Sequence, residues 1–351
     1  MIVYRIEAIR LRWPHLIGTL FIAWLGVATT VIASDVNVYS ARKEALIKPL
    51  LQTFSAQTGI NVNLITGKAD ALLQRLLVEG KASPADVFIT VDAGRLHRAK
   101  AAGLLQPLNS PIINAVVPAH LRDIDDYWVG LSQRARPIIY APERLDKTQL
   151  STYEDLASKR WSGRLCLRSS RNIYNQSLTA AMLEANGTAA TEAWVRGMVT
   201  NLARPPVGGD IDQLKAVAAG VCDLTLANTY YLGRMINSMN ANDQAVAAKL
   251  RVFWPNQEPG QRGAHSNVSG VGITRNARRI DNAQQLIEFL IAPESQAWYA
   301  QVNNEYPVVP TAKISNTLKE FGTFRVDLLP LNRLGESNRL AVELMDRAGW
   351  R

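Results

Sequence analysis

Strand-like and helix-like segments alternate between residues 36 and 101, where the chain reads VNVYSARKEALIKPLLQTFSAQTGINVNLITGKADALLQRLLVEGKASPADVFITVDAGRLHRAKA. The alternating or Val/Ile-rich segments predict strands at 36–40, 61–65 and 85–90. The amphipathic segments between them predict helices at 44–57, 69–79 and 92–101. Strands that alternate with helices of this length are typical of a parallel, doubly wound α/β sheet.

The same alternation continues in the second half of the chain. Strands are predicted at 138–140, 165–167, 224–226 and 250–253, and helices at 177–184 and 191–201. No low-complexity linker separates the two halves, so we expect two α/β lobes with a cleft between them. Ligands of such sheets bind beyond the carboxyl ends of strands, and the residues that follow each strand are therefore the first candidates for function.

The chain opens with the pattern of a secretory signal peptide. Arg5, Arg10 and Arg12 precede an apolar run that begins at Leu16, and small residues around Ala33 fit a cleavage site. An uncleaved membrane anchor is the alternative, but the run is shorter than the ~20 residues that span a bilayer. We expect residues 1–33 to be removed, so that 318 of the 351 residues remain.

The charge of the chain invites a nucleic-acid interpretation. Lys and Arg number 39 against 30 Asp and Glu, a net charge of +9, and the leader removes three Arg and Glu7, which leaves +7. These basic residues are scattered and no motif organises them, so no nucleic-acid partner is expected. An exported α/β hydrolase is also disfavoured, because no G-x-S-x-G motif is present. We expect a binding protein and not an enzyme.

Export also bears on Cys166 and Cys222, the two cysteines of the chain. An even number of cysteines in an oxidising compartment permits one disulfide, whereas two buried free thiols are the alternative. A zinc site is not expected, because no C-x-x-C is present and only three widely spaced histidines follow the leader.

Tyrosines recur where predicted strands end: Tyr39, Tyr140 and the adjacent pair Tyr230 and Tyr231. One such residue commonly packs with its hydroxyl on the backbone, but four together indicate another use. A phenol has a pKa of about 10, and a small trivalent cation stabilises its phenolate. Because hard anionic oxygen suits Fe³⁺, the pattern predicts a ferric site completed by water or an anion such as carbonate.

Arginines precede the strand that leads to Tyr140. A guanidinium binds an anion with two parallel hydrogen bonds, so Arg134 and Arg136 suit an anion beside the iron. Solvated surface charge is the alternative for both.

Whole segments of the chain resemble the periplasmic ferric-iron-binding proteins of ABC transporters. The matching segments are 38–42 (VYSAR), 84–88 (PADVF), 131–136 (LSQRAR), 172–177 (NIYNQS), 208–210 (GGD), 228–231 (NTYY), 255–257 (PNQ) and 262–270 (RGAHSNVSG). They run through nearly the whole mature chain. The tandem tyrosines that follow Asn228 are the most specific of these features.

The resemblance implies an α/β, bilobal type II periplasmic-binding-protein fold, with two doubly wound sheets joined by a two-segment hinge. It implies an N-terminal lobe of residues 34–133 plus about 262–310, and a C-terminal lobe of 134–261 plus about 311–351. It further implies a monomeric periplasmic protein that captures Fe³⁺ with a synergistic anion, such as carbonate or bicarbonate, and delivers it to an inner-membrane ABC permease.

The resemblance also implies roles for single residues. Tyr230 and Tyr231 match the paired tyrosine ligands, and Tyr140 matches the third. The start of a helix near 172–176 resembles the segment whose backbone N–H groups bind the anion. The residues expected to bind the anion are Arg136, Asn228, Asn175 and Arg42.

The first lobe departs from the family pattern. Many relatives carry His, or His followed by Tyr, where this chain has Lys43 and Glu44, and some supply a carboxylate where it has Val91. Tyr39 is therefore the candidate for a first-lobe ligand, and Tyr174 is expected to pack beside the anion loop. Lys43 is expected to face solvent or an anion. These departures keep open an alternative, a relative that binds a phosphorylated or other anionic small molecule instead of iron.

Overall fold

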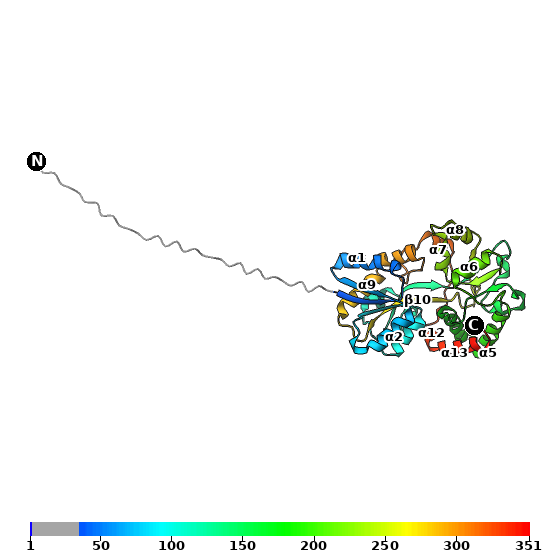
Figure 1. Ribbon diagram of the computed structural model, residues 1–351, viewed down its shortest axis with the longest axis horizontal. Helices are drawn as coiled ribbons and strands as arrows, with labels where there is room; N and C mark the ends of the chain where they lie inside the picture. Colours follow the sequence, from blue (N-terminus) through cyan, green and yellow to red (C-terminus); the bar gives the residue numbers. More distant parts are fainter. Residues whose placement is uncertain (2–34) are drawn as a thin grey trace. The chain divides into compact units, whose positions relative to one another are not determined.

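A computed structural model describes Met1 and residues 35–351 of the protein, and the residues from 35 onward fall into one compact unit (Figure 1). The expected signal peptide and its cleavage site lie outside the described residues. Within the described part of the chain, no helix combines the length and the apolar character needed to cross a membrane.

The first sheet contains the strands predicted near the start of the chain. Its order is β2 (Asn61–Thr66), β1 (Asp35–Ser40), β3 (Val87–Val91), β10 (Ser266–Thr274) and β4 (Leu105–Gln106), and β5 (Val129–Ala135) also pairs with β10. β1 pairs in parallel with β2 and β3, as predicted. β10 runs antiparallel to β3, β4 and β5, so the sheet is mixed and not purely parallel.

Helices surround this sheet: α1 (Lys48–Thr58), α2 (Ala69–Glu79), α3 (Ala93–Ala101), α4 (Pro111–Val116), α9 (Ile280–Ile291) and α10 (Pro293–Trp298). The helix predicted at 44–57 is divided into a 3₁₀ turn, η1 (Glu44–Leu46), and α1. Pro49 lies in the first turn of α1, where no intrahelical N–H is needed, and Gly59 ends the helix at φ 74°, a left-handed conformation that favours glycine.

The second sheet has the order β7 (Leu165–Cys166), β8 (Leu224–Leu226), β6 (Ile138–Tyr140) and β9 (Arg251–Phe253). β7 and β8 are parallel, but β6 runs antiparallel to both β8 and β9. Tyr140 therefore pairs with Leu224, the first residue of β8, whereas the chain leaves β8 after Leu226 at the opposite edge.

The remaining helices follow in chain order: α5 (Ile173–Thr200), α6 (Asp210–Ala218), α7 (Thr229–Ile236), α8 (Ala241–Ala248), α11 (Asn316–Glu320), α12 (Asn332–Glu336) and α13 (Asn338–Arg347). Both helices predicted between 177 and 201 belong to α5, which Gly187 interrupts at φ 75°. Short turns complete the structure at η2 (Gly80–Ala82), η3 (Ala119–Leu121), η4 (Lys147–Gln149), η5 (Glu154–Ala157), η6 (Lys159–Trp161) and η7 (Tyr299–Asn303).

Two connections join the sheets. β5 lies in the first sheet and leads to β6 in the second, and the chain returns from β9 to β10. Figure 1 shows β10 in the middle of the described residues. The α/β class with two sheets is confirmed, and the lobe boundaries remain a proposal, with β5 reaching Ala135, past the expected boundary at 133.

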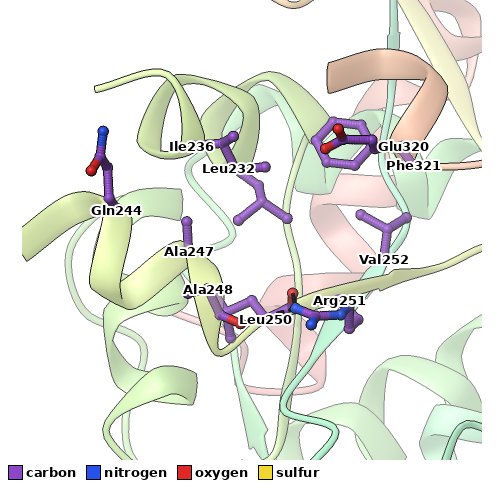
Figure 2. A pocket seen from close by; sticks show the side chains of 10 residues that line it. All are labelled: Leu232, Ile236, Gln244, Ala247, Ala248, Leu250, Arg251, Val252, Glu320 and Phe321. Carbon is purple, nitrogen blue, oxygen red and sulfur yellow. Dashed lines mark hydrogen bonds between the residues drawn. The ribbon is translucent and has the colours of Figure 1, made fainter. Parts of the chain in front are cut away.

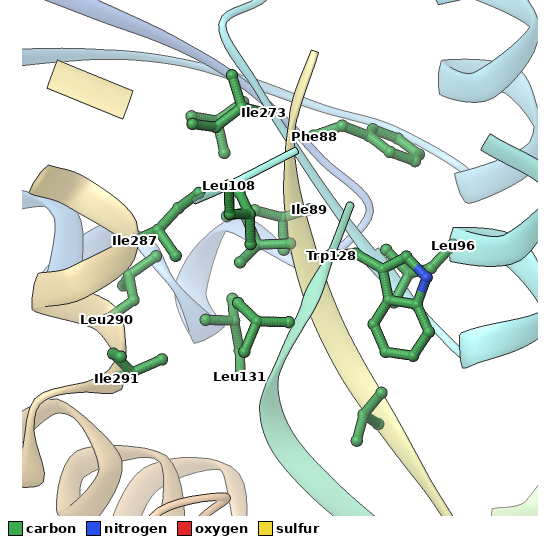
Figure 3. Packing of buried hydrophobic residues seen from close by; sticks show 14 of the residues in the cluster. Phe88, Ile89, Leu96, Leu108, Trp128, Leu131, Ile273, Ile287, Leu290 and Ile291 are labelled. Atoms are coloured by element: carbon green, nitrogen blue, oxygen red, sulfur yellow. The ribbon is translucent and has the colours of Figure 1, made fainter. Parts of the chain in front are cut away.

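The first sheet packs against α9 through an apolar core (Figure 3). Ile89 of β3 and Ile273 of β10 lie on the face that Ile287 and Leu290 of α9 cover, whereas Phe88 points to the opposite face of the sheet. All five side chains are buried. At roughly 1.5–3 kcal/mol for each buried large apolar side chain, this packing fixes the strands whose ends form the site.

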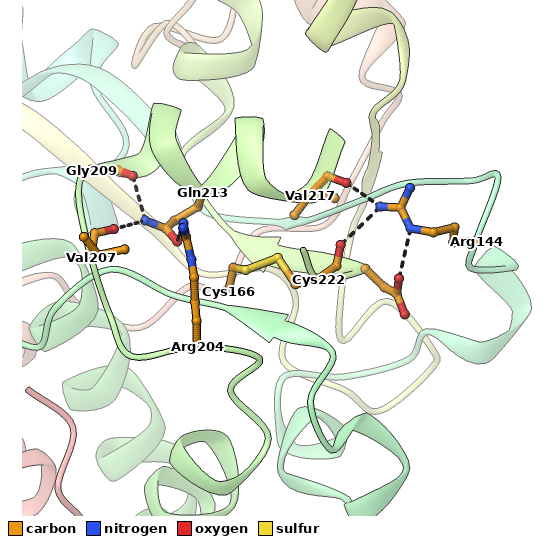
Figure 4. The surroundings of a disulfide bond; sticks show 9 residues. Arg144, Cys166, Arg204, Val207, Gly209, Gln213, Val217 and Cys222 are labelled. Carbon is orange, nitrogen blue, oxygen red and sulfur yellow. Dashed lines mark hydrogen bonds and ion pairs between the residues drawn. A yellow bond between two sulfur atoms is a disulfide. The ribbon is translucent and has the colours of Figure 1, made fainter. Parts of the chain in front are cut away.

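Cys166 and Cys222 form a disulfide, one of the two states that the sequence allowed (Figure 4). Cys166 ends β7 and Cys222 precedes β8, the parallel neighbour of β7, and the two Cα atoms are 5.9 Å apart. Arg144 donates hydrogen bonds to the carbonyl groups of Val217 and Cys222 beside it. The bridge therefore supports the sheet and takes no part in the candidate site.

Candidate functional site

Three tyrosines from two helices line one cavity of about 180 Å³. Tyr174 lies in the first turn of α5, and Tyr230 and Tyr231 lie in the first turn of α7. The full lining is Ala41, Arg42, Lys43, Leu46, Val91, Arg134, Tyr174, Tyr230, Tyr231, Arg234 and Glu305. Both sheets contribute to this cavity, because Arg42 and Lys43 follow β1 and Val91 ends β3 of the first sheet, whereas Tyr230 and Tyr231 follow β8 of the second.

Arg134 connects the tyrosines. Its Nη2 donates hydrogen bonds to the hydroxyl of Tyr174 at 2.9 Å and to that of Tyr230 at 2.5 Å. The guanidinium carbon lies 4.7 and 4.6 Å from the two ring centroids, and the ring of Tyr231 is 4.3 Å from that of Tyr230. Two phenol groups therefore meet at one buried cation, and the third lies against one of them.

Helix starts bring these tyrosines together. Adjacent residues of a strand point to opposite faces, so Tyr230 and Tyr231 can share a site only where the chain turns. The turn is made by the start of α7, where the Tyr231 N–H donates to the carbonyl of Asn228 at 3.1 Å. At the start of α5, the side chain of Asn172 accepts a hydrogen bond from the Tyr174 N–H at 3.1 Å.

The surroundings shift the pKa values of the three phenols in different directions. Burial raises the pKa of Tyr230 well above its ordinary value and, with the nearby Tyr174, raises that of Tyr231. Burial also acts to raise the pKa of Tyr174, but the charge of Arg134 and the hydrogen bonds with Tyr230 and Arg134 together lower the pKa of this phenol. Tyr230 and Tyr231 thus stay protonated at neutral pH until a cation displaces their protons, and cation binding would release protons.

Glu305 is the single carboxylate among the residues that line the cavity. Arg42 Nη2 lies 3.0 Å from Oε2 of Glu305, to which Ser132 also donates, and Arg134 Nε lies 3.7 Å from Oε1. Burial acts to raise the pKa of Glu305, but the charges of Arg42, Arg134 and Arg234 and the hydrogen bond from Ser132 together lower it. Lys43 and Arg234 add two further cations, so the lining is strongly positive.

Three of the four residues predicted to bind the anion lie together, but they surround the carboxylate of Asp210. Arg136 Nη1 donates to Asp210 at 2.9 Å and to Asn228 at 3.2 Å, and its Nη2 donates to Asn175 at 2.7 Å. Arg168 also pairs with Asp210. Arg136 is 1% exposed and does not line the cavity, so Asp210 holds the position that the prediction gave to an anion. Of the four predicted anion residues, Arg42 alone lines the cavity.

Tyr140 does not join the tyrosine cluster, and its assignment as the third ligand needs correction. It lies at the edge of the second sheet opposite to the start of α7, beside Arg251 of β9. The interpretation from strand ends failed here because β6 is antiparallel to β8, so their carboxyl ends lie at opposite edges. Tyr174, and not Tyr140, lines the cavity together with Tyr230 and Tyr231.

Tyr39 is likewise absent from the cavity lining. Its ring is buried, its hydroxyl donates to both carboxylate oxygens of Glu79 at 3.0 Å, and Arg75 lies 4.8 Å from its centroid. The hydroxyl of Tyr39, the candidate first-lobe ligand, is thus held by Glu79, the last residue of α2. Glu44, also considered at this loop, is exposed and pairs with Lys48 at 2.7 Å.

Sequence reasoning missed three residues of the site. Tyr174 lies in a segment that carried the family resemblance, but we expected it only to pack beside the anion loop. Arg134 was considered for an anion and not for the tyrosines. Glu305 lies outside every recognised motif, and nothing in its local sequence marks it. In the described residues, no three His, Cys, Asp or Glu side chains gather as a metal-binding group.

A larger pocket of about 440 Å³ lies on the other face of α7 (Figure 2). Leu232 and Ile236 line it, and they are rotated by about half a turn of helix from Tyr230 and Arg234. Its walls are mostly apolar, and no group of ligating side chains enters it. We therefore place the site in the tyrosine cavity.

Comparisons with known proteins find relatives over most of the chain. Residues 39–297 match the family described as bacterial extracellular solute-binding protein. Iron uptake protein A1 of Synechocystis is 46% identical over 90% of this chain and 88% of its own length. The Fe(3+)-binding periplasmic protein of Serratia marcescens is 30% identical over 89% of both chains. A solved Trichodesmium protein (IdiA, FutA), in complex with iron and citrate ligands, is 47% identical with a TM-score of 0.88, covering 91% of this chain and all of its own.

Proposed function

Because this chain belongs to the bacterial extracellular solute-binding protein family, we propose that it captures Fe³⁺ through the phenolates of Tyr174, Tyr230 and Tyr231. It would then deliver the ion to an inner-membrane ABC permease for iron uptake. Export by the signal peptide would place it in the periplasm, the compartment named for its Serratia relative.

The shared hydrogen-bond donor carries this proposal. Arg134 holds the hydroxyls of Tyr174 and Tyr230 together, and the ring of Tyr231 lies 4.3 Å from that of Tyr230 at a tilt of 39°. Three phenolates supply three negative charges on hard oxygen atoms, which match a trivalent ferric ion in charge and in ligand preference. Proton return to the phenolates, or reduction to Fe²⁺, would weaken binding and favour release.

A synergistic anion completes the proposed site. The cations that line the cavity exceed its one carboxylate, and they would attract an anion such as carbonate to the iron. The Trichodesmium relative is described with citrate as well as iron, which supports an anion beside the metal.

The test is the phenolate-to-iron absorption band in the visible. Protein loaded with ferric salt should show the band, and Tyr230→Phe, Tyr231→Phe and Tyr174→Phe should each weaken it. Tyr140→Phe is the matched control, since Tyr140 lies at the other edge of the sheet. An unchanged band in the Tyr230→Phe, Tyr231→Phe double variant would contradict the proposal.

The positive lining also supports a second candidate, a phosphorylated or other anionic small molecule bound without iron. Calorimetry with ferric citrate and with organic phosphates separates the two. Tight binding of an organic phosphate to iron-free protein, together with no response to ferric citrate, would favour the second candidate.

A further inference from the structure

A π-helical turn leads to Glu305, the carboxylate that lines the tyrosine cavity. η7 has the wide hydrogen-bond pattern of a π-helix, which is frequent at functional sites. Asn304 follows it at φ 54° and ψ 37°, a left-handed conformation that glycine and asparagine adopt more readily than other residues. Asn304 and Glu305 are each 2% exposed, and polar side chains buried to this degree need partners.

The position of Glu305 is fixed by the backbone of β5. Gln133 of β5 and Tyr306 exchange two backbone hydrogen bonds, at 2.7 and 2.9 Å. Ser132 and Arg134, the neighbours of Gln133, share one face of the strand because side chains alternate along it. Glu305 precedes Tyr306 and contacts both, since Ser132 donates to its Oε2 and Arg134 Nε lies 3.7 Å from its Oε1.

The carboxylate of Glu305 lies between two buried guanidinium groups. Arg42 Nη2 is 3.0 Å from its Oε2, and Arg42 and Arg134 are each 5% exposed. Two like charges repel strongly where solvent does not screen them, and the carboxylate between them offsets this repulsion. Without its charge, Arg134 would no longer be held where its Nη2 meets the hydroxyls of Tyr174 and Tyr230.

Asn304 contacts α7, the helix that carries Tyr230 and Tyr231. Its Oδ1 accepts a hydrogen bond at 2.9 Å from the side chain of Asn237, the residue that follows α7. The backbone of α7 also lies against it at Gly233, where a Cβ atom would be 2.8 Å from the Cβ of Asn304. Two consecutive residues therefore contact the arginine that holds the phenols and the helix that carries two of them.

We propose that Glu305 and Asn304 are positioning residues for ferric binding, Glu305 by fixing Arg134 and Asn304 by fixing α7. The inference rests on the proposed function and adds the residues that set the spacing of the three phenols. Glu305 acts through Arg134 and does not ligate the ion. The segment that follows η7 thus shapes the site although it supplies none of the proposed iron ligands.

The first test is a double-mutant cycle on ferric affinity, measured by competition with a calibrated chelator and followed at the phenolate band. Glu305→Gln should weaken ferric binding by roughly tenfold, as does the loss of a residue that orients metal ligands. In the Arg134→Gln background the same change should cost less than about twofold, because its route of action is already lost. The band maximum should move in the same direction in Glu305→Gln and in Arg134→Gln.

Asn304→Gly is the second variant, and it keeps the left-handed backbone while removing the side chain that contacts α7. It should weaken ferric binding by roughly 2–10-fold, the effect of one net hydrogen bond. Asp123→Asn is the control for Glu305→Gln, because Asp123 is also a buried carboxylate and pairs with Lys100 at 2.7 Å outside the cavity. Asn109→Gly is the control for Asn304→Gly, since Asn109 has φ 48° and does not line the cavity either.

Both controls should bind ferric ion as the wild type does, and urea unfolding identifies any variant that is not folded in the assay. Wild-type affinity in Glu305→Gln would overturn the role of Glu305. A full tenfold loss in the Arg134→Gln background would also overturn it, by showing that Glu305 acts on the ion directly. Equal affinities in Asn304→Gly and Asn109→Gly would overturn the role of Asn304. No phenolate band in the wild-type protein with any ferric salt would instead overturn the proposed function.

Discussion

The hydroxyls of Tyr174 and Tyr230 accept hydrogen bonds from the same nitrogen atom, Nη2 of Arg134, at 2.9 and 2.5 Å. The two tyrosines belong to different helices, α5 and α7, and the arginine belongs to β5. One shared donor thus holds the two phenol oxygens near each other before any ion binds. The arginine is 5% exposed, so its charge acts on both phenols without much screening by solvent.

This relationship predicts that Arg134→Gln weakens ferric binding by roughly 10–100-fold, the usual effect of losing a partner that orients metal ligands. The variant loses both the common donor and the charge that lowers the pKa of Tyr174. Competition of the protein with a calibrated chelator, followed at the phenolate band, measures the change. Arg339→Gln, whose side chain is 86% exposed, is the control, and equal affinities in both variants would refute the orienting role of Arg134.

A second prediction concerns Ser177, which lies in α5 one turn after Tyr174. Its hydroxyl donates at 2.7 Å to the carboxylate of Asp92, a fully buried residue whose pKa is raised by burial. Ser177→Ala removes this donor, and we expect a loss of about 1–3 kcal/mol in the free energy of unfolding at neutral pH. The loss should shrink in acid, because a protonated carboxyl needs the donor less.

Urea denaturation at neutral pH and in acid checks this expectation. Ser162→Ala, at an exposed position, is the control and should leave the free energy of unfolding unchanged. A deficit that grows as the pH falls would show that the charge of Asp92 is not what Ser177 stabilises.

The disulfide supports a third prediction. Cys166 and Cys222 close a loop across 56 positions of sequence, and the chain-entropy relation assigns such a loop about 4 kcal/mol of stability. The Cys166→Ala, Cys222→Ala double variant should unfold at a lower urea concentration by a corresponding amount. Its ferric band should persist if it is measured well below the unfolding transition, since neither cysteine lines the tyrosine cavity. An unchanged urea midpoint would show that the bridge does not constrain the unfolded chain.

The regular elements were predictable where one face is buried and the other is not. The strand at 224–226 and the helix at 69–79 have the predicted bounds, because Val, Leu and Ile recur there with the period of the element. β5 and β10 were not predicted as strands. Both are buried along their whole length yet rich in Ser, Gln, Asn and Gly, so neither alternation nor an apolar run marks them.

The kind of side chain that forms the site, tyrosine, was easier to predict than the particular residues that form it. Tyr230 and Tyr231 lie together, since adjacent residues at a helix start depend on local structure alone. Tyr140 was wrong as their partner, because whether β6 is parallel or antiparallel to β8 depends on long-range pairing. The partner of Arg136 could not be predicted for the same reason, because Asp210 lies far away in sequence.

A fourth prediction concerns His265, which is buried beside two arginines. Burial first, and then the charges of Arg136 and Arg262, lower its pKa to about 3 from an ordinary value near 6.5. Between these two pH values the unfolded chain binds more protons at this residue than the folded chain does. Stability should therefore fall as the pH drops from about 6.5 towards 3, with a contribution of at most about 1.4 kcal/mol per pH unit from this residue.

Replacing His265 isolates that contribution from the carboxylates that also titrate in acid. The His265→Gln variant should lose stability less steeply than the wild type between about pH 6.5 and 4.5, so that their free energies of unfolding converge. His120→Gln is the control, since burial alone lowers the pKa of His120 and no arginine adds to the effect. Urea unfolding at several pH values measures the slopes. Parallel curves for His265→Gln and the wild type would mean that His265 accepts its proton in the folded protein as readily as in the unfolded chain.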